Sequence, residues 1–148
     1  MNGKEEYMRR ALELAREAFD DGEVPVGAVI VRNGEIVATG RNRRETAKNA
    51  LMHAELDAIQ NACRALGGWR LWNCELYVTL EPCPMCAGAI INAHLPTVYY
   101  GADDFKNGAC GSVANLFEMG FTFHPSYEGG LLKEECSEII REFFKKLR

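Results

Sequence analysis

The run CELYVTL at residues 74–80 leads without a break into EPCPMCAGAIINA at residues 81–93. A short apolar run rich in Val, Thr and Tyr predicts a buried strand. Pro84 suits the first turn of the helix that follows it. Strands interleaved with helices are typical of layered folds, so we expect an α/β domain.

The N-terminal part of the chain predicts a helix and then a hairpin. Apolar residues recur at helical spacing from Met8 to Phe19, and Gly22 follows as a stop. The runs at residues 24–31 and 35–40 flank Asn33-Gly34, a turn signal that joins two antiparallel strands. The sheet is therefore expected to begin with this hairpin.

Further helices and one more strand are predicted downstream. Apolar spacing indicates a helix over residues 56–66, ended by a glycine pair, and a closing helix over residues 136–147. The run TVYYGA at residues 97–102 predicts a strand. Scattered glycines and aromatic residues give residues 103–128 no clear period, so we expect a loop with a short helix there.

Length and composition are those of one globular domain, residues 1–148, with 47% hydrophobic and 26% charged residues. No apolar run approaches the ~20 residues that a membrane helix needs. The N-terminal segment carries charges throughout, unlike a secretory signal, so we expect a cytoplasmic protein with no membrane partner. The net charge of −4 argues against a broadly basic nucleic-acid surface but not against a local RNA-binding patch.

Cys83 and Cys86 form a Cys-x-x-Cys pair. In a reducing compartment, such a pair favours a metal site or a catalytic role over a disulfide. At the start of a helix both sulfur atoms can face one side, where the helix dipole favours thiolates. We interpret the other four cysteines as buried or half-buried thiols: Cys63, Cys74, Cys110 and Cys136.

His53 and Glu55 lie at the entrance of the helix predicted over residues 56–66. Two residues apart, they would point to opposite sides in mid-helix, but at the boundary both can reach one site. An imidazole and two thiolates are ligands that zinc prefers, and three protein ligands leave its fourth position open for water. We predict one Zn²⁺ per subunit, held by His53, Cys83 and Cys86.

Glu55 is the predicted general acid/base. Zinc lowers the pKa of its bound water from near 15.7 toward ~7, and a carboxylate beside that water can pass its proton to a substrate nitrogen. These parts fit the hydrolytic removal of an exocyclic amine. Taken singly, the cysteine pair is more typical of a structural or redox site. A lone histidine at a helix start is more typically a cap or a satisfied core residue.

The combination resembles a known signature: His-x-Glu at a helix start, a strand, and then Pro-Cys-x-x-Cys opening the next helix, as in zinc deaminases. The chain is similar to the cytidine deaminase superfamily and, within it, to the bacterial tRNA-specific adenosine deaminases, which convert a wobble adenosine to inosine. The similarity runs nearly end to end. It includes EVPVGAVIV from Glu23, LYVTLEPCPMCAGAI from Leu76 and KNGACGS from Lys106.

The resemblance implies a three-layer α/β/α fold with a five-stranded mixed sheet, and a homodimer whose interface completes the substrate pocket. It also implies the zinc ligands and the proton transfer by Glu55 described above. Further residues receive roles only from the resemblance: Asn42 as a contact to the nucleoside, Val26, Ala54 and Pro82 as pocket wall, and Asp104 and Lys106 near the nucleic-acid backbone.

Some of these roles have simpler alternatives. The Asn42 amide has donors and an acceptor that could read a ring edge or a ribose, but asparagine after a strand is also an ordinary turn residue. Asp104 and Lys106 could equally belong to a solvated loop.

Two positions depart from the pattern of the family. Many members carry Asn-His-Arg where this chain has Thr122, Phe123 and His124, and Asp103 stands where a basic residue is often found. Both changes lower the positive charge available for phosphate. Other basic candidates remain: Arg41, Arg43, Arg44, Lys48, Lys145, Lys146 and Arg148.

Three functions are compatible with the sequence. The leading one is deamination of adenosine at the wobble position in a tRNA anticodon loop. The same zinc site could instead deaminate a free nucleobase or nucleoside such as guanine, adenosine or cytidine. A zinc-stabilised binding module without turnover is the third.

Overall fold

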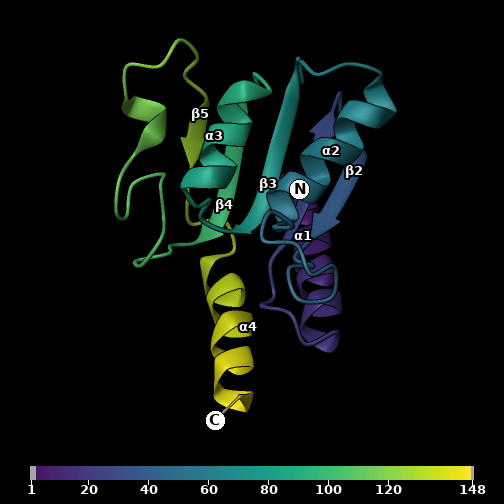
Figure 1. Cartoon of the computed structure of the whole chain (residues 1–148), viewed down its shortest axis with the longest axis vertical. Helices are drawn as coiled ribbons and strands as arrows, with labels where there is room; N and C mark the ends of the chain where they lie inside the picture. The colour runs from purple at the N-terminus through teal and green to yellow at the C-terminus, as the bar shows by residue number, and fades with distance from the viewer. Residues whose placement is uncertain (1–2, 148) are drawn as a thin grey trace.

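The computed structural model describes residues 3–147, and these residues form one mixed sheet between two pairs of helices (Figure 1). The strands are β1 (Gly27–Arg32), β2 (Glu35–Arg41), β3 (Cys74–Leu80), β4 (Thr97–Ala102) and β5 (Ser126–Glu128). The helices are α1 (Gly3–Asp20), α2 (Ala54–Leu66), α3 (Pro84–Asn92) and α4 (Lys133–Lys146), with a short 3₁₀ helix, η1 (Leu116–Glu118).

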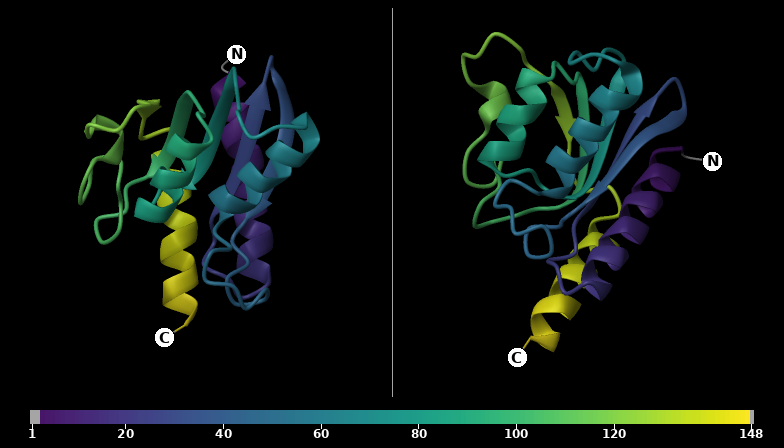
Figure 2. Two further views of the ribbon diagram at one scale, coloured as in Figure 1. Left: turned by 45° about the horizontal axis from the view of Figure 1, so that its top comes forward. Right: turned by 45° about the vertical axis from the view of Figure 1, so that its right-hand side comes forward.

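The strand order in the sheet is β2-β1-β3-β4-β5. Strand β1 pairs antiparallel with β2 and β3, whereas β4 pairs parallel with β3 and β5. Helices α1 and α4 cover one face of the sheet, and α2 and α3 cover the other (Figure 2). The three-layer α/β/α fold with a five-stranded mixed sheet is therefore confirmed.

The two faces of the sheet belong to two separate apolar cores, because successive side chains of a strand point to opposite sides. Val29 of β1 and Tyr77 of β3 pack in the core beneath α1 and α4. Ile30 and Val78, their neighbours in sequence, pack in the core beneath α2 and α3. Burial on both faces explains why these strands read as nearly continuous apolar runs.

Gly40 of β2 brings α2 unusually close to the sheet. A Cβ atom at Gly40 would overlap the carbonyl oxygen of Ala54 and the amide nitrogen of Ala58, both in the first turns of α2. The absence of a side chain therefore sets how closely the start of α2 lies against the sheet. This position matters because His53 immediately precedes that helix.

Most boundaries agree with the sequence predictions. The hairpin turn has positive φ angles at Asn33 (53°) and Gly34 (79°), as a tight turn between twisted strands requires. The short helix expected within residues 103–128 is η1. The assignment of the rest of that segment as loop is wrong at β5, whose three residues carry no alternating apolar pattern to reveal them.

Within residues 3–147, no helix is long and apolar enough to cross a membrane.

Candidate active site

The starts of α2 and α3 converge on one point. His53 occupies the position before α2 (φ −76°, ψ 157°), and Cys83 the equivalent position before α3 (φ −77°, ψ 173°). Because the backbone is extended and not helical at each position, the direction of the side chain is not fixed by the helix that follows. Pro84, at the first position of α3, has the fixed φ that suits a helix start.

The side chains at this point form a compact cluster of potential metal ligands. His53 Nδ1 lies 3.6 Å from Cys83 Sγ and 3.5 Å from Cys86 Sγ. With Zn–S bonds of about 2.3 Å and Zn–N bonds of about 2.0–2.1 Å, tetrahedral geometry puts nitrogen and sulfur ligands about 3.6 Å apart. The three residues therefore fit a zinc ion with Nδ1 as the imidazole ligand. The structure brings the three side chains together, and zinc binding by them stays a prediction.

Cys83 has the electrostatic character of a metal-binding thiolate. A hydrogen bond from the Cys86 thiol, together with His53, lowers the pKa of Cys83 to about 4 against the opposing effect of burial. The start of α3 favours negative charge at the same place. One ligand is thus anionic at neutral pH without help from a metal.

Glu55, in the first turn of α2, is 4% exposed. Burial raises the pKa of Glu55 to about 7, and the nearby charge of Cys83 acts in the same direction. A carboxyl group in this environment can both accept and donate a proton near neutral pH. Glu55 lines the same cavity as His53 and Cys83, and its role as general acid/base stays a prediction.

A cavity of about 730 Å³ opens over the cluster, which is the size range of small-molecule sites. Its wall includes eight of the ten candidate site residues, namely Val26, Asn42, His53, Ala54, Glu55, Cys83, Asp104 and Lys106. Pro82 is buried outside the wall, where its carbonyl accepts a hydrogen bond from the Ala109 amide (2.8 Å). Cys86 is fully buried behind Cys83.

Comparison with known proteins also indicates a deaminase. The sequence profile of the MafB19-like deaminase family matches residues 2–148. The tRNA-specific adenosine deaminase of Bacillus subtilis (strain 168) is 47% identical over 149 residues, covering 100% of this chain and 92% of that protein. The chain belongs to this family of deaminases.

Solved structures agree with the assignment. The deaminase is similar to a structure from a study of A-to-I editing by tRNA:A34 deaminases at the wobble position of transfer RNA. Their TM-score is 0.88 at 44% identity, covering 90% of this chain and 98% of the other. A guanine deaminase from Bacillus subtilis has a TM-score of 0.66 at 35% identity, covering 82% and 88%.

Asn42 helps to build the cavity wall of the deaminase. Its side-chain amide donates to the Val24 carbonyl (3.1 Å), and its side-chain oxygen accepts from the Arg44 amide (3.1 Å). These bonds are those of a turn residue, and they leave one amide hydrogen and one oxygen lone pair for other contacts. A role in nucleoside binding stays a prediction.

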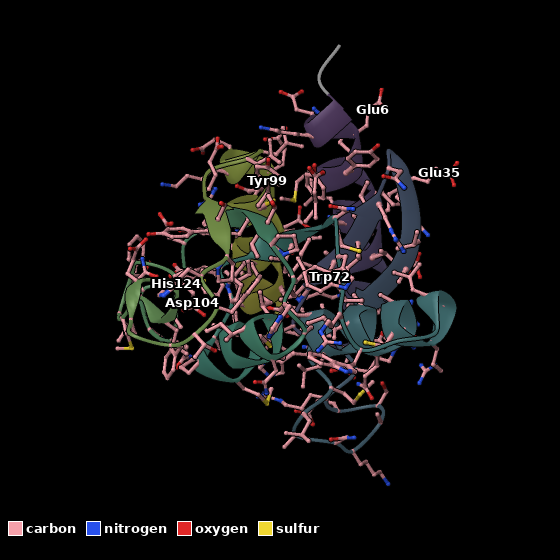
Figure 3. All side chains as sticks on the ribbon, turned by 90° about the horizontal axis from the view of Figure 1, so that it is seen from above. Glu6, Glu35, Trp72, Tyr99, Asp104 and His124 are labelled. Atoms are coloured by element: carbon pink, nitrogen blue, oxygen red, sulfur yellow. The ribbon has the colours of Figure 1, made fainter. Side chains whose placement is uncertain are left out.

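Glu81 is a buried carboxylate that the sequence reasoning missed. Its side chain is 2% exposed and accepts from the amides of Asp104 (3.0 Å), Cys110 (3.0 Å) and Ser112 (3.1 Å). Although burial opposes ionisation, hydrogen bonds from the Ser112 hydroxyl and these amides lower the pKa of Glu81. Glu81 therefore anchors the loop after β4, which carries Lys106 and Asp104, the latter labelled in Figure 3. The available signal was an acidic residue at the end of a buried strand.

Glu23 anchors the opposite wall in the same way. Its carboxylate is 1% exposed and accepts from the amides of Glu45 (3.0 Å) and Thr46 (2.6 Å). The polar loop between β2 and α2 is thereby fixed beside the cavity. Two buried acids thus hold the two loops that frame the site.

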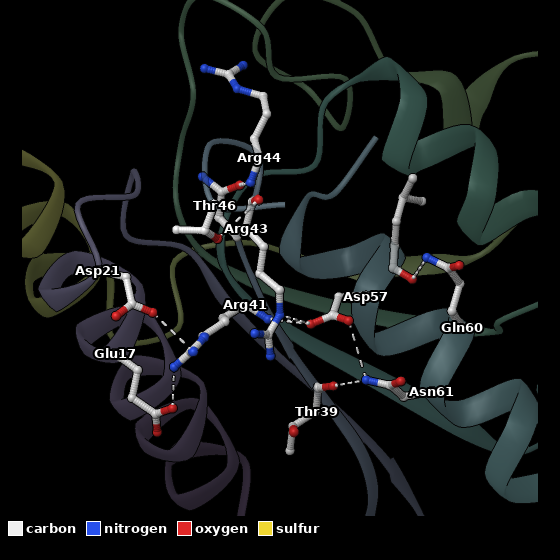
Figure 4. A network of polar contacts seen from close by, with 12 residues as sticks. Glu17, Asp21, Thr39, Arg41, Arg43, Arg44, Thr46, Asp57, Gln60 and Asn61 are labelled. Atoms are coloured by element: carbon white, nitrogen blue, oxygen red, sulfur yellow. Dashed lines mark hydrogen bonds and ion pairs between the residues drawn. The ribbon is translucent and has the colours of Figure 1, made fainter. Parts of the chain in front are cut away.

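Two of the basic residues considered for RNA binding are engaged within the protein (Figure 4). Arg41 forms ion pairs with Glu17 (2.6 Å) and Asp21 (3.1 Å), and Arg43 pairs with Asp57 (3.2 Å). Arg41 thus links β2 to α1, and Arg43 links the loop after β2 to α2. Arg44 lines the cavity and lies 3.9 Å from the Glu45 carboxylate.

Residues at the positions that depart from the family pattern also make contacts within the protein. Asp103 pairs with Lys133 (3.1 Å), so its negative charge is compensated. His124 Nδ1 lies 2.9 Å from the Phe117 carbonyl oxygen, and the Phe123 ring stacks on His94 at 4.7 Å between centroids. Arg148 lies outside the described residues.

Proposed function

We propose that this deaminase hydrolyses the exocyclic amine of adenosine at the wobble position of tRNA, leaving inosine and releasing ammonia. The observation that carries the proposal is the convergence of His53, Cys83 and the buried Cys86 at one cavity, whose wall also includes the buried Glu55. The choice of tRNA is supported by the names of the relatives at high identity and coverage.

His53, Cys83 and Cys86 would hold the zinc ion in this enzyme. Bound there with an open position, zinc would supply a water ligand of lowered pKa as the nucleophile that attacks C6 of adenine.

Glu55 transfers the protons of the reaction as a general acid/base. It accepts a proton from the attacking water and donates it to ring nitrogen N1 as the C6–O bond forms. It then accepts the second proton from the oxygen and passes it to the amine. The C6–N bond breaks, ammonia leaves, and C6 becomes a carbonyl.

We further propose that the enzyme is a homodimer that acts in the cytoplasm. Large apolar side chains on both sides of α2 in the sequence are exposed: Leu51, Trp69 and Trp72 are each more than half exposed. A second copy could cover such a surface. Sedimentation velocity at several protein concentrations tests the assembly, and a monomer throughout would contradict it.

The substrate is tested by a panel. The purified zinc protein is incubated with bulk tRNA, an RNA stem-loop with adenosine in its loop, free adenosine, guanine and cytidine, and products are identified by mass. The proposal expects inosine in the RNA substrates only. Deamination of a free compound alone would contradict it.

A free nucleobase is the second candidate, favoured by the structural similarity to guanine deaminase. Salt dependence separates the two. RNA binding weakens steeply as salt rises because phosphate contacts release counterions, whereas recognition of a neutral base is nearly indifferent to salt. A binding module without turnover is excluded if the wild-type protein shows activity that Glu55→Ala lacks.

A further inference from the structure

Phe105 stands out among the side chains that line the cavity. It is 79% exposed, the highest value among the large exposed apolar residues of the described chain. It lies in the loop after β4, at the cavity mouth, and the cavity wall also includes Phe144 and Ile140 of α4. A single exposed apolar residue needs no explanation in general, but a phenylalanine at the mouth of a reaction site can contact substrate.

The backbone on both sides of Phe105 is held in place. The Asp104 amide donates to the buried carboxylate of Glu81 (3.0 Å). The Asp104 side chain accepts from the amides of Lys106 and Asn107 (3.1 Å each). Because these bonds fix the loop before substrate arrives, little ordering cost would oppose binding to the Phe105 ring.

The charges around Phe105 suit a nucleic-acid backbone. Lys106 is exposed and forms no ion pair among residues 3–147. Asp103 is paired with Lys133, and one oxygen of the Asp104 carboxylate, Oδ1, accepts from the amides of Lys106 and Asn107. An exposed aromatic ring next to an unpaired cation is the combination that single-stranded nucleic-acid binding proteins use.

We propose that Phe105 is a stacking platform for the nucleobase adjacent to the target adenosine in single-stranded RNA. This proposal rests on the proposed function, since a free nucleobase has no neighbour to stack. With the target base directed to Glu55, a neighbouring base unstacked from the loop meets the Phe105 ring, and Lys106 lies close to the connecting phosphate. Phe105 is then a specificity-determining residue for RNA over free bases.

The test compares wild type with Phe105→Ala on the RNA stem-loop. Stacking on an aromatic side chain changes affinity enough to predict a kcat/KM lower by between about 5-fold and about 100-fold, mainly through a higher KM. Phe105→Trp keeps a ring and retains most of the activity. The matched control is Phe121→Ala, because Phe121 is also exposed (49%) but does not line the cavity.

A second substrate shows whether the effect comes from stacking. Stem-loops are prepared with an abasic residue on the 5′ or the 3′ side of the target adenosine. With one of the two, the difference between wild type and Phe105→Ala disappears, because the base that the ring contacts is gone. The side on which this happens identifies the stacked neighbour.

Three outcomes overturn the proposal while leaving the proposed function intact. The first is RNA activity that Phe105→Ala leaves unchanged. The second is a loss that persists equally with both abasic substrates. The third is sedimentation showing that Phe105→Ala separates the subunits, which would make Phe105 an interface residue. A wild-type enzyme inactive on every RNA would instead contradict the proposed function.

Discussion

His53 Nδ1 lies 3.5 Å from Cys86 Sγ, although the two residues are 33 positions apart in the chain. The contact exists because α2 and α3 begin at the same point, on one face of the sheet. Cys83 completes the cluster from the position before α3. The fold therefore assembles a zinc-sized ligand set from two helix starts.

Removal of one ligand tests that set. Replacing Cys86 by Ser exchanges a thiolate for a poor zinc ligand of similar size, so we expect zinc affinity to fall by more than about 100-fold. Zinc per chain is measured by mass spectrometry after competition with a chelator. Cys63→Ser is the control, because Cys63 is a half-buried thiol outside the cluster. Retention of zinc by Cys86→Ser would show that the ligand set is wrong.

Glu55→Gln separates chemistry from metal binding. The variant keeps the size of the side chain but cannot transfer protons, so we expect kcat to fall by about 10²–10⁴-fold while zinc content is unchanged. Activity on the RNA stem-loop and zinc per chain are measured on the same preparation. Near wild-type turnover in this variant would exclude Glu55 as the acid/base.

Glu81→Gln tests the anchor of the cavity loop. The charged acceptor of several amides is lost, so we expect unfolding to cost about 1.5–3 kcal/mol less near neutral pH. The folded-state pKa of Glu81 lies below its ordinary value of 4.5. Its contribution to stability is therefore present above pH 4.5 and declines as the pH falls through the folded-state pKa.

The measurement for this variant is urea unfolding of both proteins over a pH series. The stability gap between wild type and Glu81→Gln should narrow as the solution becomes more acidic. A gap that stays constant or widens in acid would contradict the assigned ionisation of Glu81.

Gly40→Ala tests the close approach of α2 to the sheet. The new Cβ would meet the backbone of Ala54 and Ala58, so we expect a loss of about 1–3 kcal/mol in the free energy of unfolding. Gly68→Ala is the control, since a Cβ there meets nothing within 4 Å. Equal stability of the two variants in urea would argue against this packing.

Local signals in the sequence account for the elements that were predicted correctly. Asn33-Gly34 specifies the hairpin turn, Gly67 adopts the positive φ (73°) that ends α2, and Pro84 begins α3. Each of these residues acts through its own backbone preferences, so the sequence reveals it directly. The three residues of β5 have no such signal, because only their pairing with β4 defines the strand.

In the candidate site, too, some residues could be predicted from the sequence and others could not. His53, Cys83 and Cys86 could be grouped because their chemistry makes sense only together. The roles of Glu81 and Arg41 could not be predicted, since each depends on partners that the fold brings from distant positions: the loop after β4 for Glu81, and α1 for Arg41. Burial of an acid is visible in a structure and only hinted at in a sequence.

The central claim is the hydrolytic deamination of adenosine within RNA, and the origin of the oxygen atom at C6 of inosine tests it most directly. The zinc enzyme and the RNA stem-loop are incubated in water enriched in a heavy oxygen isotope, and the nucleosides are then analysed by mass spectrometry. The account predicts inosine carrying the heavy oxygen at C6, with ammonia released in equal amount. Absence of inosine, or inosine without the isotope, would contradict it.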